Sequence, residues 1–251
     1  MTSNQRRFFL NKKIQKKQEI QLSPELTHRI RNVLRLKLND QIYLFNNSGY
    51  EFNAVISKIT RNTTSVCVID KIAAMKESNL KISVFMSLIR SEKMDFAIQK
   101  AVELGASKLV PVISKRCIMK ISTKKEDNRI SHWRKIIVKA CEQCGRTIIP
   151  SIESIKRLEE INFHEFSDKV FALHTSATES IADIELEKKD YSIIVGPEGG
   201  FEDSEINLLT KQGVSLLNLG QRILKAETAP IVALSILQNM RYNVKKNSHY
   251  I

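Results

Sequence analysis

Two glycine-containing segments in the C-terminal third of the sequence have the residue types of a ligand-binding loop. The first reads IIVGPEGGFEDSEI at 193–206, so that Gly196, Gly199 and Gly200 follow an apolar run and precede a helical pattern. Such glycines let the backbone approach a ligand closely, at the strand ends where α/β folds bind small molecules. The segment lacks the endings of a P-loop and of a dinucleotide fingerprint. It predicts a small-molecule loop, with a simple packing turn as the alternative.

The second segment, LNLGQRILKAETA at 217–229, repeats the order of strand, glycine turn and helix. Arg222 lies in its apolar loop, and the planar fork of a guanidinium binds an anion or a nucleobase carbonyl through paired donors. From these residues alone, the favoured role of Arg222 is a structural ion pair with a nearby acid such as Glu227.

A third segment, KACEQCGRTIIP at 139–150, holds Cys141 and Cys144 near a predicted helix end. A zinc site needs a second pair of ligands, and neither the other cysteines nor the five histidines have that spacing. A redox pair is not favoured, because a helix C-terminus does not stabilise thiolates. We therefore expect no metal and two packing cysteines.

Strands and helices alternate after residue 81, which is typical of an α/β domain with a parallel sheet. Strands are expected at 81–89, 108–113, 169–175, 191–196 and 214–220. Helices are expected at 92–105, 132–145, 203–213 and 227–243. Residues 114–130 are expected to form an exposed basic loop.

The first 72 residues have a different pattern, with short strands close together. Ser23 and Pro24 predict a helix start, with the helix running to about Arg35. The runs 41–45 and 50–59 around NNSG indicate a hairpin, and 63–72 a further strand. We expect a small β-barrel at 1–72 and a second domain at 73–251.

The chain is strongly basic, with 251 residues, a net charge of +13 and a pI of about 9.6. Thirteen basic residues against five acidic ones fall within residues 1–72. Clustered Lys and Arg favour an anionic partner, first of all nucleic acid, although a merely soluble basic surface is the alternative. The sequence has no apolar run long enough to span a membrane and no secretory pattern at its start, so a cytoplasmic protein is expected.

Taken together, the motifs resemble the SPOUT class of RNA methyltransferases. GPEGGF at 196–201, LGQRILKAETA at 219–229 and CEQCGR at 141–146, preceded by EKMDFAIQKAVELG, are most similar to the ribosomal RNA small subunit methyltransferase E family. That family methylates N3 of a uridine in 16S rRNA. RRFF and HRIRNVLRL resemble its N-terminal PUA-like barrel.

The resemblance implies S-adenosylmethionine (SAM) as cofactor, bound in a C-terminal trefoil knot, and a homodimer acting on the small ribosomal subunit. Arg222 would be catalytic, and Glu227 would accept a proton or fix the arginine. The cofactor would contact Leu173, His174, Gly196, Pro197, Glu198, Gly199, Gly200, Leu219, Gly220, Gln221, Ile223 and Leu224. RNA would contact Arg7, Arg29, Arg31, Arg35, Glu142, Gln143 and Arg146.

Two other functions stay open at the level of sequence. One is a ribosome-assembly factor that binds RNA without catalysis, and the other is a SPOUT enzyme with a different RNA target. The glycine-lined loops favour an enzyme, because a pure RNA-binding protein has no evident need for them.

Overall fold

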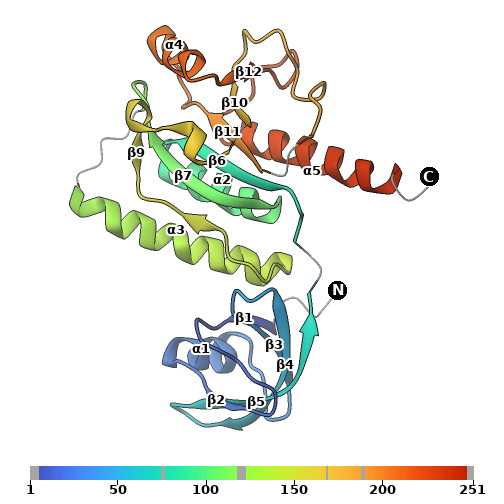
Figure 1. Ribbon diagram of the computed structural model, residues 1–251. Coiled ribbons are helices and arrows are strands. Elements are labelled where there is room, and N and C mark those ends of the chain that lie inside the picture. Colours follow the sequence, from blue (N-terminus) through green and yellow to red (C-terminus); the bar gives the residue numbers. More distant parts are fainter. Residues whose placement is uncertain (1–5, 75–76, 118–122, 168, 188–189, 248–251) are drawn as a thin grey trace. The chain divides into compact units, whose positions relative to one another are not determined.

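Two separate sheets carry the fold (Figure 1). The computed structural model describes residues 6–74, 77–117, 123–167, 169–187 and 190–247. The first compact unit consists of Met1–Glu77 together with Cys141–Ile149, and the second of Ser78–Ala140 and Pro150–Ile251. The domain boundary expected near residue 73 lies close to Glu77, where the first part of this unit ends. Nothing in the sequence indicates that residues 141–149 return to the first unit.

A five-stranded sheet in the order β1-β3-β4-β5-β2 forms the first unit. Its strands are β1 (Arg7–Phe9), β2 (Glu19–Gln21), β3 (Gln41–Phe45), β4 (Tyr50–Ile59) and β5 (Thr64–Ala73). Alternate residues of β4 face the core, so Phe52, Ala54 and Ile56 are buried. The expected hairpin is confirmed: β3 and β4 are antiparallel, and the turn between them contains Asn47 and Gly49 at positive φ.

The predicted helix after Ser23 is present but shorter than expected. The Ser23 hydroxyl accepts a hydrogen bond from the Leu26 amide at 3.3 Å, which caps α1 (Pro24–His28). The chain continues as one π-helical stretch, η2 (Arg29–Val33). Arg35 then adopts a φ of 52°, and the turn carries Leu36 into the core. The helix therefore ends at Val33, before the predicted end at Arg35, and the turn at Arg35 allows Leu36 to be buried.

A parallel sheet in the order β12-β10-β11-β6-β7-β8, with β9 also paired to β7, forms the second unit. The strands are β6 (Lys81–Ser87), β7 (Ala106–Ile113), β8 (Ser151–Ile152), β9 (Lys156–Arg157), β10 (Lys169–Leu173), β11 (Asp190–Val195) and β12 (Ser215–Leu217). The central strands β6 and β11 are buried along almost their whole length, as expected of apolar runs covered on both faces. The predicted parallel α/β class is confirmed.

Four α-helices follow strands of this sheet along the chain (Figure 1). They are α2 (Ser91–Glu103), α3 (Thr123–Cys144), α4 (Asp203–Lys211) and α5 (Ala229–Asn247), and two short 3-10 turns, η3 (Leu158–Glu160) and η4 (Phe163–Glu165), lie between β9 and β10. Helices α2 and α5 pack against each other, and α4 packs beside β12. No helix within the described ranges is long and apolar enough to cross a membrane.

The expectation of an exposed loop at 114–130 is wrong from residue 123 onward, because α3 begins there. Ile130, Trp133 and Ile137 are buried at helical spacing, so they form the apolar face of α3. The polar residues at the start of this helix conceal the pattern in the sequence. Residues 118–122 of the expected loop lie outside the described residues.

Candidate active site

A cavity of about 480 Å³ lies where three parallel strands of the second unit end. Strands β10, β11 and β12 are neighbours in the sheet, so their carboxyl ends meet at one edge. Leu173 pairs with Leu217 in the sheet, and both line the cavity. Its remaining lining comes from Lys93, 174–175, 195–201, Leu219, Gly220, 222–226 and Ala229.

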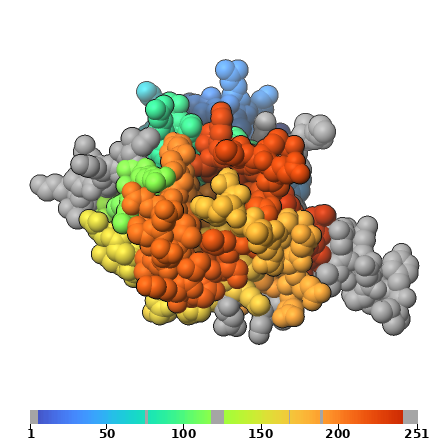
Figure 2. All heavy atoms as spheres, turned by 90° about the horizontal axis from the view of Figure 1, so that it is seen from above, coloured from blue at the N-terminus to red at the C-terminus, as the bar shows by residue number. Residues whose placement is uncertain are grey.

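The segments that follow β10 and β12 lie side by side on the surface of the second unit (Figure 2). Ser180 and Asn218 form a parallel bridge, and the Asn218 amide donates to the Glu179 carbonyl at 2.9 Å. The Asn218 side chain donates to the Ala177 carbonyl, also at 2.9 Å. These bonds fix the start of the second glycine segment, two residues before Gly220.

Two glycines give the cavity walls their shape. Gly200 has a φ of +70° and Gly220 a φ of +100°, a region that L side chains rarely adopt. A Cβ atom built on either residue would meet no atom within 4 Å, so both backbones border open space. Side chains at these two positions would project into that space, which is the arrangement expected where a ligand lies against the backbone.

The loop after β7 holds the first glycine segment in place. Arg116 Nη1 donates to the Gly199 carbonyl at 2.9 Å. The Lys115 amide donates to Glu205 Oε1 at 2.8 Å, and the Glu202 amide donates to Glu205 Oε2 at 2.9 Å. Glu205 is buried and completes a capping box with Glu202 at the start of α4. One carboxylate thus joins the β7 loop to the helix that follows the glycine turn.

Lys93 is the cation that faces the two acidic groups near the cavity. Its Nζ lies 3.8 Å from Glu198 Oε1 and 3.5 Å from Glu227 Oε1. Glu227 therefore pairs with Lys93 and not with Arg222, so the structural ion pair considered from the sequence is not formed. Arg222 lines the cavity with an exposed side chain and makes no ion pair within the described part of the chain.

Comparison with known proteins places this geometry in a family. An RNA methyltransferase domain family matches residues 76–238, and an RNA methyltransferase PUA domain matches residues 25–66. The ribosomal RNA small subunit methyltransferase E of Buchnera aphidicola subsp. Schizaphis graminum is 33% identical over 92% of this chain and 95% of its own length. The chain belongs to the ribosomal RNA small subunit methyltransferase E family. The Bacillus subtilis member is 29% identical over 88% of this chain and 92% of its own length.

Solved structures agree with membership of the methyltransferase E family. A putative methyltransferase of Legionella pneumophila, in complex with bound SAM, has a TM-score of 0.89 at 35% identity, covering 93% of this chain and 97% of that one. A ribosomal RNA small subunit methyltransferase E of Neisseria gonorrhoeae bound to SAM has a TM-score of 0.87 at 29% identity, with the same coverage. The resemblance stated from the sequence motifs is thereby confirmed.

The structure gathers nearly all the cofactor residues expected from the methyltransferase E family around the cavity. Every one of them lines it except Gln221, whose side chain is exposed outside the lining. Sequence reasoning missed Lys93, Thr175, Val195, Phe201, Leu217, Lys225, Ala226 and Ala229. Most of these adjoin predicted positions in the chain and could have been found by extending each segment. Lys93 has no such signal, because it comes from the distant helix α2.

Arg7, expected to contact RNA, lies inside the first unit. Its side chain is buried, and its two Nη atoms donate to the carbonyls of Cys141, Glu142, Gly145 and Arg146 at 2.8 to 3.2 Å. Its Nε is paired with Glu51. The guanidinium satisfies carbonyls at the C-terminal end of α3, where Gly145 has a φ of 91°. The structure therefore corrects this expectation: Arg7 caps a helix and has no donor turned to solvent.

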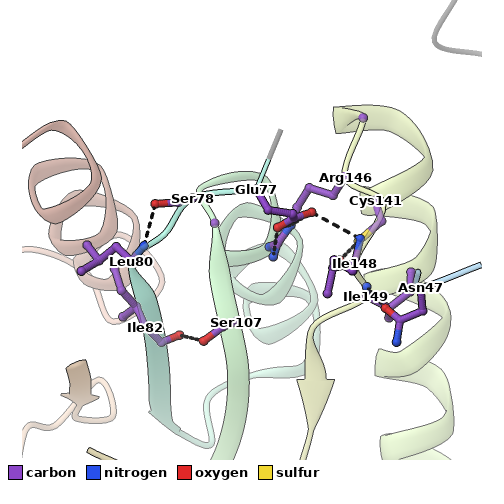
Figure 3. Close-up of polar contacts among 12 residues, drawn as sticks. Asn47, Glu77, Ser78, Leu80, Ile82, Ser107, Cys141, Arg146, Ile148 and Ile149 are labelled. Atoms are coloured by element: carbon purple, nitrogen blue, oxygen red, sulfur yellow. Dashed lines mark hydrogen bonds and ion pairs between the residues drawn. The ribbon is translucent and has the colours of Figure 1, made fainter. Parts of the chain in front are cut away.

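Two further residues of the expected RNA set are also internal to the first unit. Glu142 is buried, accepts from the Phe9 amide at 3.1 Å and pairs with Arg29. Arg146 is buried and pairs with Glu77 at 2.9 Å. Figure 3 shows the Glu77 carboxylate between Arg146 and the Ile148 amide. Both residues are corrected to structural roles.

The other four residues expected to contact RNA keep solvent-facing surface. Gln143, Arg31 and Arg35 are exposed, and Arg29 is half-buried beside Glu142. Arg31 Nη1 also donates to the Arg61 carbonyl at 2.8 Å. Basic side chains of the α1–η2 stretch are thus presented outward, as the helical pattern predicts.

Cys141 packs inside the first unit. It is fully buried, and burial raises the pKa of its thiol to about 12. Cys144 is half-buried, and neither cysteine is part of a disulfide. Within the described residues, no three His, Cys, Asp or Glu side chains are grouped so that they could hold a metal ion. Cys141 is a packing residue, as expected.

Proposed function

We propose that this protein is a SAM-dependent methyltransferase that methylates N3 of a uridine in 16S rRNA of the small ribosomal subunit. One observation carries the proposal: the two glycine segments of the methyltransferase E family meet at one cavity, at the end of a parallel sheet. The Neisseria gonorrhoeae relative was solved with SAM bound.

The residues of the cavity fit this cofactor. A volume of about 480 Å³ lies within the range of small-molecule sites. Leu173, Leu217 and Leu224 supply apolar wall, and the open space beside Gly200 and Gly220 lets a ligand lie against the backbone. SAM supplies a methyl group on a sulfonium, which is transferred by direct displacement. The task of the protein is therefore chiefly to align the reacting groups.

Arg222 has the position and chemistry of a substrate-orienting residue. Uridine N3 carries a proton that leaves before or during attack, and negative charge then develops on the neighbouring carbonyl oxygens. A guanidinium that lines the cavity, and that forms no ion pair with any described residue, stabilises that charge. Glu227 is absent from the cavity lining and is paired with Lys93, which supports a role in fixing the cavity wall over a role as proton acceptor.

RNA binding and methyl transfer are assigned to different parts of the chain. We propose that residues 1–72 bind RNA, with Arg29, Arg31 and Arg35 as contacts together with Gln143, and that residues 73–251 transfer the methyl group. The basic bias of residues 1–72 supports this assignment. A homodimer in the cytoplasm completes the proposal, on the strength of the family resemblance.

Isothermal titration of the full chain with SAM tests the cofactor assignment directly. We expect one site per chain with micromolar affinity, competed by S-adenosylhomocysteine. The absence of binding heat at millimolar SAM would contradict the proposal and favour the alternative, an RNA-binding assembly factor without catalysis.

A further inference from the structure

Lys93 lines the cavity, yet the proposed reaction gives it no task. It lies in the first turn of α2, far in sequence from both glycine segments. Its ammonium is 3.8 Å from Glu198 in the first segment and 3.5 Å from Glu227 in the second. The Lys93 ammonium thus links both glycine segments to α2.

Burial makes this arrangement stronger than a pair of surface contacts. The side chain of Lys93 is 35% exposed, that of Glu198 24% and that of Glu227 13%. Electrostatic interactions strengthen as solvent is excluded, and two carboxylates held around one point would repel each other without the ammonium. Without the Lys93 ammonium, the two glycine segments would lose their common ionic contact. Repulsion between the carboxylates of Glu198 and Glu227 would then push the segments apart.

Lys93 is the ion-pair partner of the Glu227 carboxylate. Its second oxygen, Oε2, is enclosed and has no hydrogen-bond partner within the described ranges. The carboxylate is held through Oε1 by Lys93, at the position from which the chain enters α5. A buried carboxylate oxygen without a partner is costly, so its single ionic contact is the more important for holding this wall.

We propose that Lys93 is a positioning residue that holds the glycine turn at 196–200 and the segment at 219–227 at the separation the cofactor requires. This inference rests on the proposed function, because it takes SAM as the ligand. Walls that are fixed before the ligand arrives lower the ordering cost of binding. We call the contacts of Lys93 with Glu198 and Glu227 the clamp. Removal of the clamp should lower the affinity for the cofactor more than the rate of the chemical step.

The test compares Lys93→Met, which keeps length and removes charge, with Lys93→Arg, which keeps charge. By calorimetry, Lys93→Met should raise the Kd for SAM at least tenfold, and Lys93→Arg should restore it to within threefold of the unmodified chain. The KM for SAM should rise in parallel, while kcat at saturating SAM stays within threefold. Lys100→Met is the matched control, because Lys100 lies on the same helix, is 32% exposed and pairs with Glu103 at 2.8 Å away from the cavity lining.

A double-mutant cycle separates the clamp from direct contact with the cofactor. Glu227→Gln should also weaken SAM binding, and Lys93→Met combined with Glu227→Gln should bind no more weakly than Lys93→Met alone. A second cycle combines Lys93→Met with Glu198→Gln. Glu198 is more exposed than Glu227, so its substitution is less apt to disturb folding. Circular dichroism melting of each variant verifies that it is folded at the temperature of the titration.

Three results would overturn the clamp. An unchanged Kd in folded Lys93→Met would remove the role of Lys93, and multiplicative losses in both cycles would show independent contacts. In either case the unmodified chain would still bind SAM, so the proposed function would stand. Failure of the unmodified chain to bind SAM would overturn the proposed function and this inference together.

Discussion

The Arg222 side chain lines the cavity and is exposed, which separates its contribution to catalysis from its contribution to folding. Arg222→Ala should lower kcat about 100-fold, the typical cost of losing one charge-stabilising donor. The free energy of unfolding should stay within about 0.5 kcal/mol, as for other exposed sites. Turnover on saturating RNA and urea denaturation measure the two quantities.

Arg157→Ala serves as the control for Arg222, because Arg157 is 60% exposed and does not line the cavity. It should leave kcat and unfolding unchanged. Near-normal turnover by Arg222→Ala at saturating RNA and SAM would show that another group stabilises the developing charge.

Cys141 allows a pH prediction from burial. Thiols react as thiolates, and a pKa raised to about 12 leaves about one thiol in ten thousand ionised at pH 8. With N-ethylmaleimide at pH 8, Cys141 should react at least about 100-fold more slowly than the half-buried Cys67 and Cys144. Raising the pH toward the pKa of Cys141 should speed its labelling.

Peptide mass spectrometry follows each cysteine separately. In urea, where burial is lost, Cys141 should react as fast as the other cysteines. Labelling of Cys141 in the folded protein at the rate of Cys144 would contradict the buried, protonated thiol.

Among the elements, Glu205 shows how a helix start supports the glycine turn. Its carboxylate accepts from the amides of Lys115 and Glu202 at 2.8 and 2.9 Å. Glu205→Ala would leave both donors without this acceptor, so the free energy of unfolding should fall by about 2 kcal/mol. Urea denaturation measures the loss, with Asn207→Ala on the exposed face of α4 as control. Equal stability of the two variants would mean that the capping box contributes nothing.

Elements with a strong local pattern could be predicted from the sequence. The strands around 81–89 and 191–196 are apolar because both sheet faces are covered, and the hairpin around residues 46–49 carries its own turn residues. The start of α3 could not be predicted, because residues 123–129 read TKKEDNR and contain no apolar residue that would mark a buried face.

The candidate site was predictable where the chain runs continuously along the cavity. The glycine segments each follow a strand, and the family resemblance joins them. Lys93 was missed because only the packing of α2 brings it to the cavity. Arg7 was misjudged because its partners are main-chain carbonyls, which every residue possesses and which leave no trace in the sequence.

At the scale of the whole molecule, the chain returns to its first unit at 141–149 after it has begun the second. Asn47 Oδ1 accepts from the Ile149 amide at 2.6 Å, and Glu77 binds Arg146 from the end of the first stretch (Figure 3). Arg7 adds four carbonyl contacts to the same segment. The first unit is therefore completed by a segment that lies far away in the sequence, and we expect its stability to depend on these contacts.

Arg7→Met tests this dependence. It leaves Glu51 without its cation and four carbonyls without their donor, so the free energy of unfolding should fall by about 3 kcal/mol or more. Chemical denaturation should detect this loss, with Arg6→Met as the control because Arg6 is 40% exposed and lies 3.7 Å from Asp40. A loss no larger than that of the control would contradict the capping role.

Methylation of N3 of a uridine in 16S rRNA is the activity that we propose for this chain. Its most direct test is transfer of a labelled methyl group from SAM to small ribosomal subunits that lack their own modifications, followed by mass spectrometry of the released nucleosides. We expect label in N3-methyluridine, and labelling about 100-fold slower with Arg222→Ala. Label in a different nucleoside, or no label although SAM binds, would contradict the assigned target.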